Sequence, residues 1–200
     1  MKKTMFLIVT LVTILVVNVQ AQWREVMYGL KGGWNISNIS NVGANNKMSV
    51  HLGAFAEWRI NDYLGISQEL LYSRQGFRDK FHVENLGKVK QKIRLNYLNI
   101  PILAKLYILD AISIDLGPQF GFVLNGKDKQ KSDDVIIKSK IKDFNVLDVS
   151  FVLGASCRLN DFIFSSRYNI GLTNVLDYGK DNNKNHVFQL SVGYCLNNLF

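Results

Sequence analysis

Alternation of apolar and polar residues constrains the fold of this chain more than any other sequence feature. Between Ile112 and Leu124 the even-numbered residues are all apolar, whereas the odd-numbered ones are mostly small or polar, among them Asp115 and Gln119. A two-residue period places successive side chains on opposite faces of a β-strand. The same period recurs at 51–60, 148–159 and 188–196. The chain is therefore expected to be all-β.

Eight segments of this kind follow one another along the chain. We expect strands near 27–36, 49–60, 63–77, 92–107, 112–124, 145–159, 162–173 and 186–197. Their connections alternate in length. Short turns are expected at Asn61-Asp62, Leu109-Asp110-Ala111 and Asn160-Asp161, and longer polar connections near 37–48, 78–91, 125–144 and 174–185. Asn and Asp suit tight turns because they tolerate the left-handed backbone conformation.

An even number of antiparallel strands, with short turns at one end and long loops at the other, is typical of outer-membrane barrels. We therefore predict an eight-stranded antiparallel up-and-down transmembrane β-barrel with short periplasmic turns and four longer external loops. The strands of a soluble β-sandwich would show the same alternation, so the composition of the polar face has to distinguish the two folds. That face holds nine of the 15 glycines and charges of both signs, and aromatic residues on the other face gather near strand ends, as in an interfacial girdle. Both features favour the barrel.

Nine charged residues share the polar face and are predicted to fill the barrel interior. They are Lys31, Glu57, Arg59, Glu69, Lys105, Asp115, Asp148, Arg158 and Arg167. An eight-stranded barrel is only wide enough to hold side chains, and a wide aqueous channel needs roughly 16 strands. Buried charges have to be paired, and these nine are close to balanced. We interpret them as a structural plug and not as an ion pathway.

The first 21 residues have the layout of a secretory signal peptide. Lys2 and Lys3 precede an apolar run from Met5 to Val17, and small residues then allow cleavage between Ala21 and Gln22. The apolar run is shorter than the roughly 20 residues that a membrane-spanning helix needs. We expect residues 1–21 to be removed and residues 22–200 to form the barrel domain.

The positive charge of the mature chain is concentrated in the expected loops. Without Lys2 and Lys3, the chain keeps +6 of its net +8. Residues 78–92 carry five basic and two acidic residues, and residues 125–144 carry six lysines and four aspartates. This excess would attract the phosphates of lipopolysaccharide, although a merely solvated loop surface is the alternative. The export signal and mixed-sign runs such as Lys127-Asp128-Lys129 argue against nucleic acid as a partner.

Residues suited to catalysis or metal binding are sparse. The three histidines, His51, His82 and His186, lack the spacing of metal ligands, and Cys157 and Cys195 are expected on opposite faces of non-adjacent strands. We predict no metal, cofactor or disulfide, and no enzymatic activity. A lipid A-modifying enzyme that uses His51 or His186 with a serine and a carboxylate stays open as an alternative.

Several segments resemble the PorT-like outer-membrane β-barrel family of Bacteroidetes. They include Gly29–Ser37, His51–Phe55, Gln68–Ser73, Leu95–Pro101, Gly117–Gly121 and Arg167–Leu172, and together they extend over about residues 27–196. The resemblance implies an outer-membrane barrel whose molecular role is mostly unassigned. A founding member is linked to secretion of gingipain proteases and to the type IX export pathway, but no residue of this chain matches a functional site of that kind.

These expectations lead to one hypothesis and two alternatives. The first is a non-catalytic barrel that acts in envelope structure or through its loops, with outer-membrane lipid and lipopolysaccharide as its surroundings. The alternatives are an accessory component of protein secretion, in contact with envelope or secretion proteins, and a lipid A-modifying enzyme. Phe200 resembles the terminal aromatic signal that the barrel-assembly machinery reads, so this machinery is an expected partner during insertion.

Overall fold

The computed structural model describes residues 25–39, 46–76, 78–83, 87–131, 136–141, 145–174 and 184–197. These residues form one antiparallel sheet. Its strands are β1 (Glu25–Ile39), β2 (Lys47–Arg59), β3 (Leu64–Gln75), β4 (Arg78–Val83), β5 (Gly87–Leu109), β6 (Ile112–Lys131), β7 (Ile136–Ile141), β8 (Leu147–Leu159), β9 (Phe162–Asn174) and β10 (Lys184–Cys195). In the part of the chain that the structure describes, no helix is long and apolar enough to cross a membrane.

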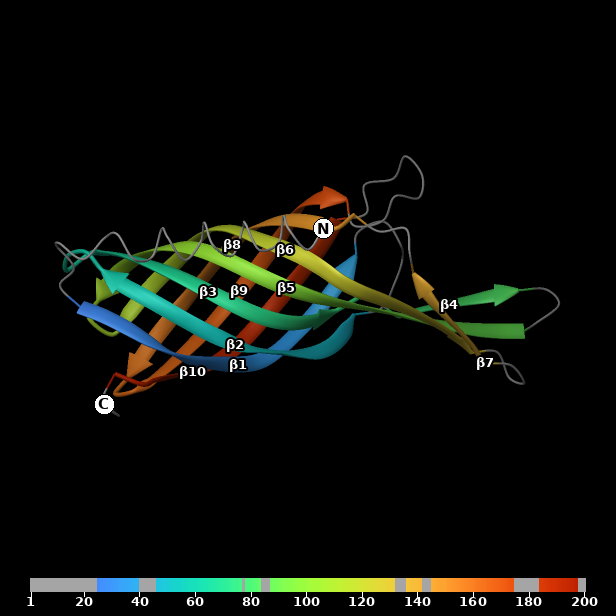
Figure 1. The fold of residues 1–200 in the computed structure, drawn as a ribbon, viewed down its shortest axis with the longest axis horizontal. Helices are drawn as coiled ribbons and strands as arrows, with labels where there is room; N and C mark the ends of the chain where they lie inside the picture. The colour runs from blue at the N-terminus through green and yellow to red at the C-terminus, as the bar shows by residue number, and fades with distance from the viewer. Residues whose placement is uncertain are drawn as a thin grey trace.

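Eight of the strands close into a barrel in the order β5-β3-β2-β1-β10-β9-β8-β6 (Figure 1). The barrel closes because β6 also pairs with β5. The predicted eight-stranded up-and-down barrel is therefore confirmed. The signal peptide assigned to residues 1–21 and the terminal Phe200 lie outside the described residues.

Strands β4 and β7 correct the prediction of long irregular connections at 78–91 and 125–144. β4 pairs with the first residues of β5, and β7 pairs with the last residues of β6. Figure 1 shows β5 and β6 running on together past one end of the barrel, with β4 and β7 at their sides. We call this four-stranded extension, made of β4, residues 87–96, residues 125–131 and β7, the rim sheet. These segments were predicted to be loops because their residues are polar. Backbone hydrogen bonds of a β-ladder, however, form regardless of side-chain polarity.

The opposite end of the barrel carries the short turns. Asn61 accepts hydrogen bonds through Oδ1 from the backbone N–H of Tyr63 (2.9 Å) and of Leu64 (2.8 Å). Asn160 has a φ of 53°, the left-handed conformation expected of an asparagine in a tight turn. Strand β1 begins and strand β10 ends at this same end (Figure 1). The short turns are thus confirmed.

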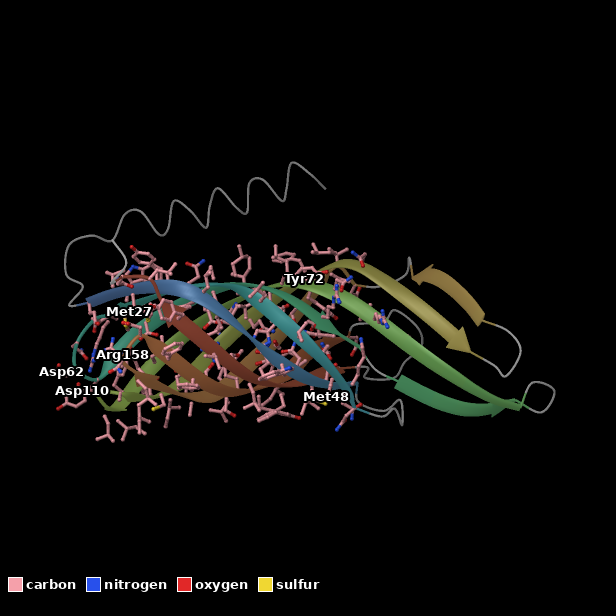
Figure 2. All side chains as sticks on the ribbon, turned by 90° about the horizontal axis from the view of Figure 1, so that it is seen from below. Met27, Met48, Asp62, Tyr72, Asp110 and Arg158 are labelled. Carbon is pink, nitrogen blue, oxygen red and sulfur yellow. The ribbon has the colours of Figure 1, made fainter. Side chains whose placement is uncertain are left out.

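An apolar belt surrounds the barrel between the turns and the rim sheet. On β5 the outward residues from Leu98 to Ile108 are all apolar, a stretch of eleven residues. A tilted strand needs about 9–11 residues to cross the hydrocarbon core of a bilayer. Side chains project outward all along this wall, from the end near Asp110 to the end near Met48 (Figure 2). The belt therefore has the height of a membrane.

A β-bulge separates the barrel part of β5 and β6 from their rim-sheet part. Asn96 pairs with Asn125, but the next residue, Tyr97, pairs with Val123, so that Leu124 is an extra residue in β6. Leu124 and Asn125 are both exposed, and Gly126 beyond them is buried. The bulge thus exchanges the inward and outward positions of β6 for all residues that follow it.

The inward face holds apolar residues as well as charges. Met27, Phe55, Ile163 and Cys195 form a buried apolar cluster near the turn end. Leu71 also points inward and is only 1% exposed, whereas its neighbour Gln68 is half-buried on the outer wall. These two residues depart from the simple alternation of β3.

Candidate functional site

Six of the nine predicted interior charges meet in one network inside the barrel, which we call the central network. It comprises Lys31 of β1, Glu57 of β2, Glu69 of β3, Lys105 of β5, Asp115 of β6 and Arg167 of β9. Six of the eight barrel strands contribute one residue each. Since the side chains are at most 4% exposed, the network lies in the barrel interior and not at its mouth.

Arg167 is the residue that joins two halves of this network. Its Nη1 lies 2.8 Å from Glu69 Oε1, and its Nη2 lies 2.9 Å from Asp115 Oδ2. The planar guanidinium suits this role because its N–H groups donate in fixed directions to two separate carboxylates. One arginine therefore crosslinks strands β3, β6 and β9.

Two lysines complete the network. Lys31 Nζ lies 2.6 Å from Glu69 Oε1, and Lys105 Nζ lies 3.1 Å from Glu57 Oε2 and 3.3 Å from Asp115 Oδ1. Three basic and three acidic residues balance, so the network carries no formal net charge. Removing one partner of a buried ion pair leaves an uncompensated charge, which is strongly unfavourable. The arrangement suits a rigid plug.

The other three predicted charges lie elsewhere on the inward face. Arg59 bonds to Asp110 of a short turn, with Nη2 and Oδ1 2.8 Å apart, and its guanidinium lies 4.3 Å from the ring centroid of Tyr107. Arg158 pairs with Glu25 at 2.8 Å. The sequence interpretation assigned no interior role to Asp110, Tyr107 or Glu25. The alternation of β5 could have indicated Tyr107, because this residue lies two positions after Lys105 and therefore on the same face of the strand.

Asp148 is the ninth residue and lies toward the rim. Its Oδ1 accepts a hydrogen bond from Thr173 Oγ1 at 3.1 Å, and the same hydroxyl accepts one from the backbone N–H of Val149 at 2.8 Å. Asp148 is thus held by local hydrogen bonds between β8 and β9. The nine residues predicted for the barrel interior thus form a central group of six and three separate sites.

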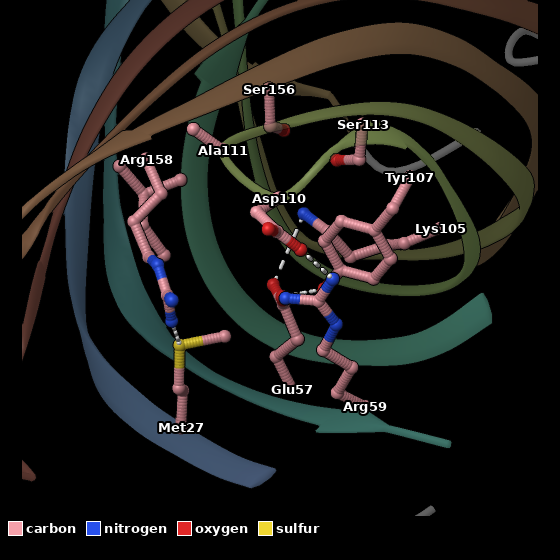
Figure 3. A pocket seen from close by; sticks show the side chains of 11 residues that line it. Met27, Glu57, Arg59, Lys105, Tyr107, Asp110, Ala111, Ser113, Ser156 and Arg158 are labelled. Atoms are coloured by element: carbon pink, nitrogen blue, oxygen red, sulfur yellow. Dashed lines mark hydrogen bonds and ion pairs between the residues drawn. The ribbon is translucent and has the colours of Figure 1, made fainter. Parts of the chain in front are cut away.

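A small cavity lies between the central network and the short turns (Figure 3). Its lining includes Glu57, Arg59, Lys105 and Tyr107, and Tyr107 donates a hydrogen bond to Glu57 Oε1. The cavity holds about 10 Å³, which is room for about one water molecule. It is too small for an organic substrate.

A second polar layer, toward the rim, surrounds His51. Its Nδ1 lies 2.7 Å from Asn35 Oδ1, and its Nε2 lies 2.9 Å from Ser191 Oγ. Serine, histidine and asparagine in this order resemble a nucleophile, base and orienting group. All three are buried on the inward face, and Gln189 also donates to Asn35 Oδ1 (3.0 Å). This geometry suits a packed hydrogen-bond layer better than a site that admits a lipid.

Possible metal ligands and the two cysteines are dispersed in the part of the chain that the structure describes. Among residues whose positions are described, no three His, Cys, Asp or Glu side chains gather closely enough to hold a metal ion. Cys157 and Cys195 are free thiols, with Cys195 buried and Cys157 half-buried.

The strands of the rim sheet are rich in basic residues. Together they carry eleven basic and two acidic residues. The ladders place basic residues opposite one another, as Lys90 lies opposite both Lys80 and Lys131. That nucleic acid is not a partner stays a prediction.

Comparison with known proteins assigns the fold to a family. Residues 20–177 match the family described as outer membrane protein beta-barrel domain. The chain belongs to this family. It is an integral protein of the outer membrane. No curated protein shows significant sequence similarity to it.

Solved structures show the same architecture at low sequence identity. Ail, the attachment invasion locus protein of Yersinia pestis, is 16% identical, with a TM-score of 0.51 over 86% of this chain and 99% of Ail. Ail in complex with the heparin analogue sucrose octasulfate gives a TM-score of 0.52 at the same identity and coverage. Neisserial surface protein A is 9% identical, with a TM-score of 0.50 over 84% of this chain and 96% of its own. These likenesses concern the fold.

Proposed function

We propose that this outer-membrane barrel is non-catalytic and acts by surface contacts made through its rim sheet. The observation that carries this proposal is the contrast between its two charged regions. The central network is buried and neutral, whereas the strands of the rim sheet carry eleven basic and two acidic residues. A surplus of positive charge at this end of the barrel favours contact with an anionic partner.

Several finer assignments belong to the same proposal. Residues 1–21 act as a signal peptide that is cleaved between Ala21 and Gln22, and the barrel-assembly machinery inserts the mature chain. The recurring segments quoted above support membership of the PorT-like group. Outer-membrane lipid surrounds the belt, and lipopolysaccharide surrounds the rim.

Bilayer conductance tests the non-channel part of the proposal. The purified, refolded barrel is inserted into a planar bilayer, and we expect no steady ionic current. A parallel variant with Lys31, Glu69 and Arg167 all changed to alanine removes the centre of the network and is the positive control. Steady current through the unaltered protein would overturn the interpretation of the network as a plug.

A rim-less variant tests the surface-contact part. Replacing residues 78–93 and 126–144 by short Gly-Ser linkers leaves the strand pairs of the closed barrel intact. We expect this variant to fold, as shown by heat-modifiable migration on gels, and to lose the surface contacts of the parent. If every surface phenotype of a deletion strain were restored by the rim-less variant, the rim sheet would not be the functional part.

The same deletion strain separates the alternatives. Loss of secreted proteases would support a role in protein export. Altered lipid A masses on expression, together with labelling of Ser191 by a serine-reactive fluorophosphonate, would support a lipid-modifying enzyme. Among the described residues, the Ser191–His51–Asn35 hydrogen bonds are the feature that favours the enzyme, and a Ser191→Ala variant is its control.

A further inference from the structure

A polar side chain interrupts the apolar belt on the wall formed by β2, β3 and β5. Gln68 of β3 lies opposite Ala56 of β2 and opposite Ile102 of β5. Residues directly opposite in an antiparallel ladder share a face of the sheet, and Ile102 is exposed on the outside of the barrel. The amide of Gln68 therefore faces the membrane and not the barrel interior.

The depth of Gln68 in the membrane follows from its partner on β5. The outward residues of β5 are apolar from Leu98 to Ile108, and Ile102 lies four residues from one end of this stretch and six from the other. At about 3.3 Å per residue and a tilt of about 45°, the nearer end is about 9 Å from Ile102 along the membrane normal. A glutamine side chain cannot span this distance. The Gln68 amide therefore lies within the hydrocarbon core.

Hydrocarbon is an unfavourable surrounding for this amide. The side chain has two N–H donors and an acceptor oxygen, and lipid acyl chains offer a partner to neither. Within the described part of the chain, no group forms a hydrogen bond with the Gln68 amide. Polar side chains inside a membrane are stabilised when a neighbouring protein supplies the missing partner. Gln68 thus points to a second protein in the membrane.

The residues around Gln68 allow another protein surface to approach closely. Ala56 is its direct neighbour on β2, and Ala54 and Ala104 lie on the adjoining rungs of the two ladders. Small residues at membrane interfaces let two backbones come together. The alanines alone would not identify a binding surface, but here they surround an amide that lacks a partner. We call Gln68 together with Ala54, Ala56, Ile102 and Ala104 the Gln68 patch.

We propose that two copies of this chain associate in the membrane through their Gln68 patches, with the two Gln68 amides hydrogen-bonded to each other. Copies inserted in the same direction have Gln68 at the same depth, so a two-fold axis along the membrane normal brings the amides together. Each amide then donates one N–H to the oxygen of the other. β-Sheets that face each other pack about 10 Å apart, and two glutamine side chains that point toward each other fill about this distance.

A second copy is the favoured partner because the Gln68 patch is self-complementary. A two-fold interface presents the same surface from both sides, so the residue on its axis has to pair with itself. A charged residue would repel its twin there, whereas a neutral amide is both donor and acceptor. Neither the rim sheet nor the central network contributes to this interface. The inference therefore does not rest on the proposed function, and the two can fail independently.

Sedimentation equilibrium in density-matched detergent micelles tests the proposal, because it measures the mass of the refolded protein at several protein-to-detergent ratios. We expect the parent to be a reversible dimer. Gln68→Leu removes the amide but keeps a side chain of similar size, and we expect its dimer to be about 10- to 100-fold weaker. Ala56→Phe keeps the amide but obstructs the approach, and should give a monomer. Both substitutions place apolar side chains against lipid, so both variants should fold, as heat-modifiable migration on gels will show.

The opposite wall of the barrel provides matched controls. Strand β9 lies four strands away from β3 in either direction around the barrel. Its exposed residue Ser166 lies opposite the exposed Ala155 of β8. Ser166→Leu and Ala155→Phe make the same kinds of change on this wall, and we expect both to leave the dimer as stable as that of the parent.

Three results in micelles would overturn the proposal. They are a parent protein that is monomeric at every ratio, a Gln68→Leu dimer as stable as that of the parent, and equal weakening by the controls on the opposite wall. A photoreactive amino acid in place of Leu70, an exposed neighbour of Gln68 on β3, extends the test to the native membrane. It should crosslink the chain to another copy of itself, and crosslinks to a different protein alone would overturn the second copy as the partner.

Discussion

Gly154 lies directly opposite Arg167 in the ladder between β8 and β9, and the stem of Arg167 occupies the space that a side chain at position 154 would need. A Cβ at this position would lie 2.5 Å from Arg167 Cγ and 2.6 Å from the carbonyl oxygen of Ser166. The glycine thus allows the arginine to cross the interior to Glu69 and Asp115. The central network therefore depends on Gly154, although this glycine has no side chain that could bond to it.

Gly154→Ala is expected to destabilise the barrel by about 1–3 kcal/mol, because the added carbon displaces the arginine from its two carboxylates. Urea unfolding in lipid vesicles, followed by tryptophan fluorescence, measures the change. Gly32→Ala is the matched control, since a Cβ there would meet the flexible Leu52 Cδ1 at 3.3 Å and the carbonyl oxygen of His51 at 3.6 Å, an ordinary contact distance. We expect the control to stay within about 0.5 kcal/mol of the parent, and equal effects at both positions would contradict the explanation.

Arg167→Met removes the residue that bridges two buried carboxylates. Because Glu69 and Asp115 would then each lose a charged partner, we expect a loss of about 3–5 kcal/mol in the free energy of unfolding. Arg158→Met is the comparison, because the pair it makes with Glu25 is partly exposed and should contribute no more than about 1 kcal/mol. Similar losses for both substitutions would show that burial of the network has no energetic consequence.

Ile102→Lys tests the position of the membrane. Ile102 points outward near the middle of the apolar belt, and a lysine there should cost about 2–4 kcal/mol in a bilayer. Asn96→Lys lies on the same strand and face but at the edge of the belt, where we expect a cost of about 0–1 kcal/mol. Unfolding of both variants in vesicles measures the difference, and the reverse order would place the membrane elsewhere on the barrel.

Cleavage of the chain between Ala21 and Gln22 predicts the mass of the mature protein. Intact mass spectrometry of the protein from outer membranes should give a chain that begins at Gln22. Ala21→Arg should block processing, because signal peptidases need a small residue at that position. A purified barrel that retains Met1 would contradict the assignment of residues 1–21.

The strands of the barrel could be predicted because alternation depends only on local sequence. Each strand alternates with the same period, and asparagine at the turns suits the backbone that the turns require, as the φ of Asn160 shows. The inward parity of residues such as Lys31 and Glu69 followed from the same pattern. The contact between Lys31 and Glu69 could not be predicted from this pattern, because the two residues are 38 positions apart and meet only through the stagger of the closed sheet.

The rim sheet could not be predicted by the criterion that found the barrel. That criterion looks for apolar residues at every second position, whereas β4 and the start of β5 have basic residues there. The period was nevertheless present in Lys88, Lys90, Lys92 and Arg94. A search for alternation of any two residue classes, and not only of apolar with polar, would have found these strands.

Leu124 determines which positions of β6 beyond it lie inside. Because it is one extra residue, Gly126 is buried, whereas the buried residues before the bulge, such as Val123, have odd numbers. Inserting or deleting a single residue between Leu124 and Gly126 would exchange the two faces of the strand end, while a change of two residues would leave them as they are. The length of this short segment, more than its composition, therefore decides which of its residues reach the exterior.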